Sequence, residues 1–266
     1  MIPRRTVVLA PILALPALAL AQSALTTPAQ AQAVHTRGLD FDQFVTELWK
    51  DAQAKGITRT TFAKAFADVT PDARVIATTK KQPEYGKPAG AYVTSIASAT
   101  NAREGLKKEA QWRPTFDAVE KRFRVERWVI LAIWGMETSY GALKDKWDGI
   151  RSLATLAFIK YRDPYFRDEL LIALHIIQDG HIPREKFATS WAGAMGQTQF
   201  MPTNFVDYAI DFDGDGKRDI WTSVPDILAS TANYFAKAAG GWKWGVPWGF
   251  EVIVPKGFDL MKSRAT

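Results

Sequence analysis

The spacing of apolar residues along the chain predicts a mainly helical protein. In residues 39–54 the apolar side chains recur at intervals of three and four positions, the period of an amphipathic helix, and Asp40 is a suitable N-cap. A second helix is predicted after Thr58, and a weakly apolar one over residues 92–108. Prolines and a glycine make residues 80–88 a loop. These segments predict a helical platform that carries no chemistry of its own.

The centre of the chain, residues 124–140, predicts an almost uninterrupted apolar helix. Its apolar run extends from Trp128 to Met136 and is followed by Glu137. On a helix, Trp134 and Glu137 lie on one face, so the carboxyl shares that face with bulky apolar side chains. Such surroundings disfavour the charged form and raise the pKa, which suits a general acid. The alternative interpretation is a glutamate at a helix end that points into water.

Another helix is predicted from residue 163 to residue 180. Asp163 is its expected N-cap, Pro164 its first residue, and Gly180 ends it. Three aromatic residues crowd its start: Tyr161, Tyr165 and Phe166. They are either part of the core or a platform for sugar rings, which tyrosine faces commonly bind.

Residues 190–202 combine small residues with uncharged polar ones. Gly193, Ala194 and Gly196 allow a ligand or another helix to approach the backbone closely. Uncharged donors and acceptors surround them, namely Ser190, Gln197, Thr198 and Gln199. This mixture suits the N-acetyl and hydroxyl groups of an amino sugar, and it equally suits a tight crossing of two helices.

Residues 211–219 carry the start of an EF-hand calcium loop. Oxygen ligands stand at positions 1, 3, 5 and 9 of the loop, which are Asp211, Asp213, Asp215 and Asp219. Position 6 is Gly216, and position 7, Lys217, contributes its backbone carbonyl. Carboxylates so close in sequence repel one another unless a cation lies between them. The motif is incomplete, because position 12 is Thr222 and not glutamate.

Composition narrows the possible functions. The chain has 266 residues, 47% of them hydrophobic, which is enough to bury the core of one domain or of two tightly packed subdomains. It has no cysteine, which excludes disulfides, thiolate metal sites and a cysteine nucleophile. The formal net charge of +6 suits an anionic polymer, but no basic run is dense enough to favour nucleic acid. The three histidines are scattered without the spacing of a zinc site.

The first 33 residues predict a signal peptide with a short linker, and therefore export to the periplasm. Arg4 and Arg5 precede an uncharged apolar run over residues 7–21, and small-residue cleavage sites follow at 19–21 and 31–33. The alternative is a retained membrane anchor, although the run is short for a bilayer span and contains two prolines. Membrane association is expected only if this leader is retained.

Four motifs occur in a fixed order: WGMETSYG at 134–141, SLATLAF at 152–158, AGAMGQTQFMP at 192–202 and DFDGDGKRDIW at 211–221. Together they closely resemble the lytic murein transglycosylase B family. The resemblance implies a mainly α fold (α+β, with a lysozyme-like core), a calcium loop and little β-structure. It implies a catalytic domain over residues 34–255, with a helical part at about 39–120 and a core at about 121–250.

The same resemblance implies an activity and a set of site residues. The family cleaves the MurNAc–GlcNAc β-1,4 bond of peptidoglycan strands without water and leaves a 1,6-anhydro-MurNAc end. Glu137 matches the catalytic glutamate. Four residues match positions that line the saccharide cleft: Ser190, Gln199, Tyr165 and Tyr234. Arg162 is a looser fifth match, because the preceding loop is one residue shorter. The distal calcium ligand is placed at Asp226. A monomer without an organic cofactor is expected.

A single acid is chemically consistent with a lyase. A glycoside hydrolase normally uses two carboxylates, whereas no second acid stands out near these motifs outside residues 211–226. In a lyase, Glu137 protonates the glycosidic oxygen and then removes the proton from the C6 hydroxyl. Two alternatives stay open: a hydrolytic muramidase on the same fold, and a non-catalytic, calcium-stabilised module that binds the cell wall.

The C-terminal part predicts one strand-like run over residues 250–254, followed by a tail at 256–266. A lone strand is not stable by itself. Members of the family usually continue past this point and return further strands to the core. We therefore expect either that the strand pairs elsewhere in the chain or that the domain is truncated.

Overall fold

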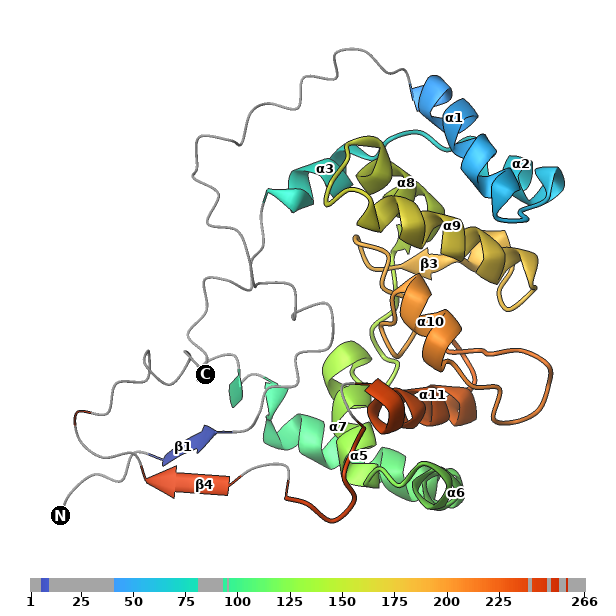
Figure 1. Cartoon of the computed structure of the whole chain (residues 1–266). Coiled ribbons are helices and arrows are strands. Elements are labelled where there is room, and N and C mark those ends of the chain that lie inside the picture. Colours follow the sequence, from blue (N-terminus) through green and yellow to red (C-terminus); the bar gives the residue numbers. More distant parts are fainter. Residues whose placement is uncertain are drawn as a thin grey trace. The chain divides into compact units, whose positions relative to one another are not determined.

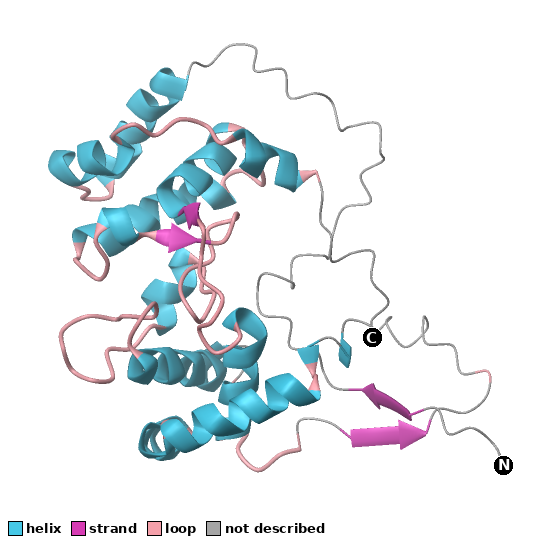
Figure 2. Ribbon diagram, turned by 180° about the vertical axis from the view of Figure 1, so that it is seen from behind, coloured by secondary structure: helices cyan, strands magenta, loops and turns pink. Residues whose placement is uncertain are grey.

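The structure is a computed structural model, and it describes residues 6–9, 41–80, 93–94, 96–238, 241–247, 250–253 and 257. The chain divides into two units, Val34–Trp244 and a smaller one made of Met1–Ala33 with Gly245–Thr266. The larger unit carries the helices (Figures 1 and 2). This arrangement confirms the expectation of a mainly helical protein with little β-structure.

The described part of the larger unit is made mostly of helices. In chain order they are α1 (Phe41–Ala54), α2 (Arg59–Phe66), α3 (Ala73–Thr79), α5 (Ala99–Gln111), α6 (Arg113–Phe123), α7 (Arg127–Thr138), α8 (Gly149–Phe158), α9 (Tyr165–Gln178), the 3-10 helix η3 (Arg184–Lys186), α10 (Pro202–Tyr208) and α11 (Val224–Lys237). Two short strands, β2 (Trp147–Asp148) and β3 (Ala188–Thr189), pair antiparallel between them. Trp147 lies opposite Thr189 in this pair.

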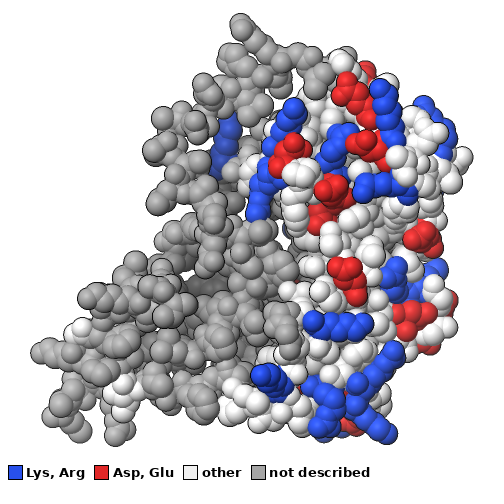
Figure 3. Space-filling view, in the orientation of Figure 1, with Lys and Arg blue, Asp and Glu red and all other residues white. Residues whose placement is uncertain are grey.

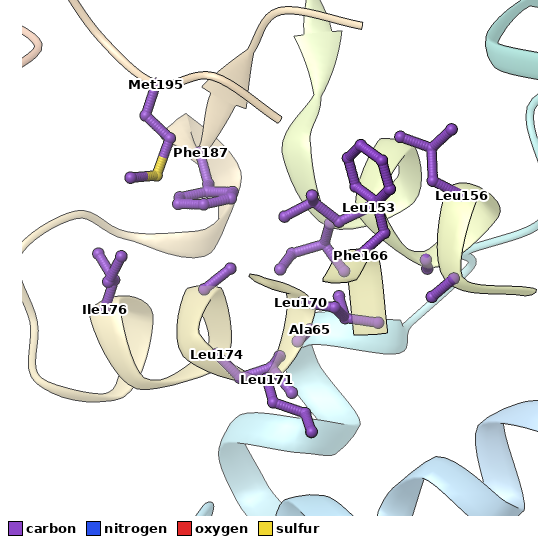
Figure 4. Close-up of a cluster of buried hydrophobic side chains, with 14 of the residues drawn as sticks. Ala65, Leu153, Leu156, Phe166, Leu170, Leu171, Leu174, Ile176, Phe187 and Met195 are labelled. Carbon is purple, nitrogen blue, oxygen red and sulfur yellow. The ribbon is translucent and has the colours of Figure 1, made fainter. Parts of the chain in front are cut away.

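The main hydrophobic core forms around α8 and α9. These two helices pack against each other, and the N-terminal helices pack on them: α2 contacts both, and α3 contacts α8. Leu153 of α8 and Leu170 of α9 are fully buried and are joined by Phe187 and Met195 from later segments (Figure 4). Asp148 begins α8 as an N-cap, because its carboxylate accepts the Arg151 N–H.

A second group of helices holds α7 in place. Helix α7 packs against α5, α6 and α11, while α10 contacts both α9 and α11. Tyr140, just after α7, lies between two glycines that leave it room. A Cβ on Gly105 or Gly135 would come within 2.5 Å or 2.7 Å of the Tyr140 hydroxyl oxygen. The two small residues therefore allow α5 and α7 to close around this side chain.

Several predicted element boundaries are confirmed and others are wrong. Helix α2 begins after Thr58, as predicted, and the Thr58 hydroxyl accepts the Thr61 N–H as its N-cap. The helix expected over 92–108 instead resumes after Ser98 and runs to Gln111, because the Ser98 hydroxyl caps a new start. The predicted cap Asp163 is also wrong: the N-cap residue of α9 is Pro164, which has no side chain to accept a hydrogen bond. The predicted cap of the first helix lies outside the described residues.

The smaller unit contains one antiparallel pair of strands. Strand β4 (Phe250–Ile253) pairs with β1 (Thr6–Leu9), with Thr6 opposite Ile253. The strand expected near the C-terminus therefore has a partner, and this partner lies within the segment predicted to be a signal peptide. Cleavage of that segment would remove β1. Within the described residues, no helix is both long enough and apolar enough to cross a membrane.

Candidate active site

Glu137 lies one residue before the end of α7, where the backbone turns sharply. Ser139 and Tyr140 both have left-handed φ angles, 49° and 59°, and their N–H groups return to the carbonyls of the last helical turn. The Glu137 side chain is partly buried, and none of the described residues donates a hydrogen bond to it. Burial raises the pKa of Glu137 to about 7. This confirms the predicted direction, because desolvation disfavours the charged carboxylate.

The end of α7 is held by the amide of Gln197. The indole N–H of Trp134 donates to Gln197 Oε1 at 2.7 Å, and Gln197 Nε2 donates to the Trp221 carbonyl at 2.8 Å. A Cβ on Gly141 would come within 2.2 Å of the same Oε1 atom. From the sequence, Gln197 and Thr198 suited either an amino sugar or a tight crossing of two helices. Both side chains are buried, and the Gln197 amide connects parts of the protein to one another.

Ser190 and Gln199 each keep one polar group available. The Ser190 hydroxyl oxygen accepts the Ala194 N–H at 3.0 Å, which leaves its hydrogen without an acceptor among the described residues. Gln199 Nε2 donates to the Gly196 carbonyl at 2.9 Å and to Asp145 Oδ1 at 3.1 Å. Its Oε1 atom has no hydrogen bond to any described residue. The segment therefore offers one donor and one acceptor, both uncharged.

Asp145 contacts this segment and was not identified from the sequence. It lies in the connection between α7 and β2, and its second oxygen, Oδ2, accepts the Gly196 N–H at 3.0 Å. Burial raises the pKa of Asp145 to about 6, although the hydrogen bonds from Gln199 and Gly196 lower it. The interpretation that no second acid lies near the motifs is therefore wrong. Asp145 carries no signal in the sequence, because Lys144 and Lys146 flank it as in an exposed loop.

The predicted tyrosines lie at two different places around this segment. The Tyr234 ring on α11 packs against Phe200, the residue after Gln199, with ring centres 5.7 Å apart. Tyr165 begins α9, and burial together with the nearby Glu169 carboxylate raises its pKa. The Arg162 guanidinium lies over the Tyr165 ring, 5.6 Å from its centre.

Glu169 joins Tyr165 to the segment that follows residues 190–202. Its two carboxylate oxygens accept the backbone N–H and the hydroxyl of Thr203, at 2.9 Å and 2.8 Å. The buried carboxylate thus accepts a hydrogen bond from a backbone N–H in the first turn of α10, the Thr203 N–H, which has no acceptor within the helix. Tyr165 and Tyr234 are therefore connected to the two ends of residues 199–203. Sequence reasoning did not identify Glu169, because its apolar helix predicts only a core contact.

Three carboxylates of the acidic loop come together. One oxygen each from Asp211, Asp213 and Asp226 lies within 4.8 Å of the others. Asp226 is fully buried and accepts the N–H groups of Phe212, Asp213 and Asp219, and burial raises its pKa to about 6. Clustered carboxylate oxygens are the ligands that Ca²⁺ prefers, so the donor set fits a hard divalent cation. Asp215, also predicted as a ligand, lies outside this group and accepts the Lys217 N–H at 2.8 Å.

Together, these features define a helical protein with a desolvated glutamate at the end of an apolar helix and an uncharged polar segment beside that helix end. Helical proteins of several classes could carry such a site. The family described as "Transglycosylase SLT domain" matches residues 40–266. The chain belongs to this family.

Individual relatives agree with this assignment. The chain is 35% identical over 172 residues to the membrane-bound lytic murein transglycosylase B of Escherichia coli (strain K12), which covers 63% of this chain and 46% of the relative. It is similar to SltB3 from Pseudomonas aeruginosa, solved in complex with NAG-NAM-pentapeptide, with 46% identity and a TM-score of 0.79 over 84% of this chain and 59% of SltB3. The Escherichia coli lytic transglycosylase Slt35, solved in complex with calcium, matches at 28% identity with a TM-score of 0.67 over 77% of this chain and 64% of Slt35. The chain thus spans about half the length of the curated relative.

Proposed function

We propose that this protein is a peptidoglycan lytic transglycosylase, which cleaves the MurNAc–GlcNAc β-1,4 bond and forms 1,6-anhydro-MurNAc. The observation that carries the proposal is the environment of Glu137. Its pKa of about 7 allows the same carboxyl to donate a proton and then to accept one near neutral pH. The membership of the family and the glycan fragments named in the SltB3 complexes support the choice of substrate.

The proposed reaction uses one carboxyl group twice. Protonated Glu137 donates its proton to the glycosidic oxygen, the C1–O bond breaks, and the GlcNAc fragment leaves with a hydroxyl group. The N-acetyl oxygen of MurNAc stabilises the positive charge at C1. The Glu137 carboxylate then accepts the proton of the C6 hydroxyl while O6 bonds to C1, which restores the acid. No water is consumed, and the Ser190 donor and the Gln199 acceptor would hold the sugar during both steps.

Two alternatives are less well supported. A hydrolase on this fold needs a second carboxylate to activate water or to attack the sugar. Asp145, which contacts the turn at residues 196–199, is a candidate, but both of its oxygens already accept hydrogen bonds from the protein. A module that only binds the cell wall gives no reason for an acid kept protonated by burial. Such a module does not need a shifted pKa, whereas catalytic acids commonly have one.

The decisive experiment is mass spectrometry of the fragments released from purified sacculi. We expect anhydro ends, which differ from hydrolysed ends by the mass of one water molecule. Glu137→Gln should release no fragments yet still bind sacculi, because glutamine keeps the shape but cannot transfer the proton. Reducing ends would favour the hydrolase, and cleavage by the Glu137→Gln variant would remove Glu137 from the mechanism.

A calcium ion bound by Asp211, Asp213 and Asp226 is part of the proposal. The ion would offset the repulsion among three carboxylates and hold the connection between α10 and α11. The calcium complex of Slt35 supports this choice of metal. No catalytic step is assigned to the ion.

The proposed substrate also fits the predicted export, since peptidoglycan lies outside the cytoplasm. Lys and Arg are interspersed with Asp and Glu over the described part of the face in Figure 3. That mixture differs from the single-sign stripe typical of proteins that bind nucleic acid. Glycan strands are therefore the proposed partner, and the leader at residues 1–33 is proposed to direct the protein to the periplasm.

A further inference from the structure

Asp145 joins the connection after α7 to the turn at residues 196–199. Its Oδ2 accepts the Gly196 N–H at 3.0 Å and its Oδ1 accepts from Gln199 Nε2 at 3.1 Å, so one carboxylate holds the first and the last residue of the turn. The backbone of this turn is unusual at both ends. Gly196 has a φ of 61°, a Cβ there would come within 2.6 Å of the Ile220 carbonyl oxygen, and Gln199 itself has a left-handed φ of 51°.

These contacts determine which way the Gln199 amide faces. Nε2 has two hydrogens, and its two acceptors are the Asp145 carboxylate and the Gly196 carbonyl at 2.9 Å. An ionised carboxylate and a carbonyl can only accept hydrogen bonds, so the nitrogen must face them. The opposite assignment of the amide would place Oε1 against two acceptors. Gln199 Oε1 is therefore held outward as an acceptor that no described residue occupies.

We propose that Asp145 is a positioning residue, which acts through Gln199 by presenting Oε1 as the hydrogen-bond acceptor for an N–H or O–H group of the bound amino sugar. Without the carboxylate the amide can turn and present its N–H groups instead, which repel the same sugar donor. The Ser190 hydroxyl supplies the complementary donor to an N-acetyl carbonyl. This inference rests on the proposed function, since it assigns a role at that site.

The test is a double-mutant cycle between Asp145→Asn and Gln199→Ala, with kcat/KM for glycan cleavage as the readout. Asparagine keeps the shape of aspartate but must turn an N–H toward one of two donors. The loss of one hydrogen bond to a charged group predicts a fall of about tenfold in kcat/KM. Because the remaining oxygen of asparagine can still accept the Gly196 N–H, the loss in Asp145→Asn should pass through Gln199, and we expect the double variant to be no slower than Gln199→Ala.

Controls separate positioning from general stability. Asp148→Asn makes the same change three residues later, at the end of β2, where the carboxylate caps α8 and bonds to Arg184 at 2.8 Å. We expect it to lower the melting temperature without lowering kcat/KM. Affinity for glycan, measured in the inactive Glu137→Gln background, should fall with Asp145→Asn. A purely structural role would change the melting temperature and leave this affinity intact.

Two results would overturn the positioning role: wild-type kcat/KM in Asp145→Asn, or losses that add in the double variant. If Asp145→Asn does not fold, Asp145→Glu, which moves the carboxylate by one methylene, is compared with Gln199→Ala in the same way, and additive losses again refute it. Failure of the proposed function looks different. In that case the wild-type protein releases no anhydro fragments, or releases them independently of Glu137.

Discussion

Replacing Glu137 with glutamine should stabilise the fold, and only at high pH. In the folded protein Glu137 keeps its proton to a pKa of about 7, whereas the ordinary value, expected in the unfolded chain, is 4.5. Between these values the folded state binds more protons, so stability falls as the pH rises through this window. The difference between the two pKa values corresponds to a cost of about 3 kcal/mol, which is fully present above the folded pKa. Below the unfolded pKa both states are protonated and the cost is absent.

Glutamine cannot ionise, so Glu137→Gln should exceed the wild type by up to about 3 kcal/mol at high pH. For a domain of this size that is an increase in melting temperature of roughly 6–12 °C. The assay is thermal unfolding of both proteins across the acidic to mildly alkaline range. Asp145 and Asp226, whose pKa values are also raised, titrate equally in both proteins and cancel in the comparison. Glu47→Gln on exposed α1 is the matched control and should show no such pH-dependent gain.

A stability difference between Glu137→Gln and the wild type that does not change with pH would refute the reasoning. It would mean that the carboxyl is solvated in the folded protein. A variant less stable than the wild type at high pH would be a stronger contradiction, because it would mean that a favourable partner holds the ionised form. Either outcome would also remove the main support for Glu137 as an acid near neutral pH.

Three further predictions concern the metal, the tight turn and the leader. Calcium at a hundredfold excess over Kd should stabilise the wild type by about 2.7 kcal/mol, as seen in thermal unfolding; Asp213→Ala should abolish this gain and the exposed Asp207→Ala should not. Gly196→Ala should cost more free energy of unfolding than Gly180→Ala in urea titrations, because both have positive φ but only Gly196 lies against the Ile220 carbonyl; equal losses would contradict the close contact. N-terminal sequencing of the protein exported from a bacterium should begin at one of the two predicted cleavage points, and an intact N-terminus on membranes would favour the anchor.

Local patterns were sufficient where the physics is local. The apolar run before Glu137 predicts both α7 and the direction of the pKa shift, because apolar neighbours on one helix face disfavour a charged carboxylate. Thr58 and Gly180 mark helix ends through contacts within a few residues. The acidic loop predicts a cation site because most of its carboxylates lie close together in the sequence. Asp226 was identified only through the resemblance to a family.

Contacts distant in sequence could not be predicted. Asp145 bonds to residues 51 and 54 positions away, and its charged neighbours predict only an exposed loop. Gln197 suited a ligand-binding amide because nothing near it in the sequence shows that its amide is hydrogen-bonded to Trp134 and Trp221. The partner of β4 lies near the other end of the chain, in a segment whose composition predicts a leader. Each of these features depends on which distant segments pack together.

The Gln197 amide also has a consequence for the order of folding. Gln197 is bonded to Trp134 of α7, 63 positions earlier in the chain, and to Trp221, 24 positions later. Closing such long loops costs entropy before any contact compensates for it, so distant contacts form more slowly than helices do. During synthesis from the N-terminus, α7 emerges well before the segment that fixes its end. We therefore expect the end of α7 to lack its tie to the Gln197 amide in a nascent chain that already contains α7, until residues 197–221 have been added.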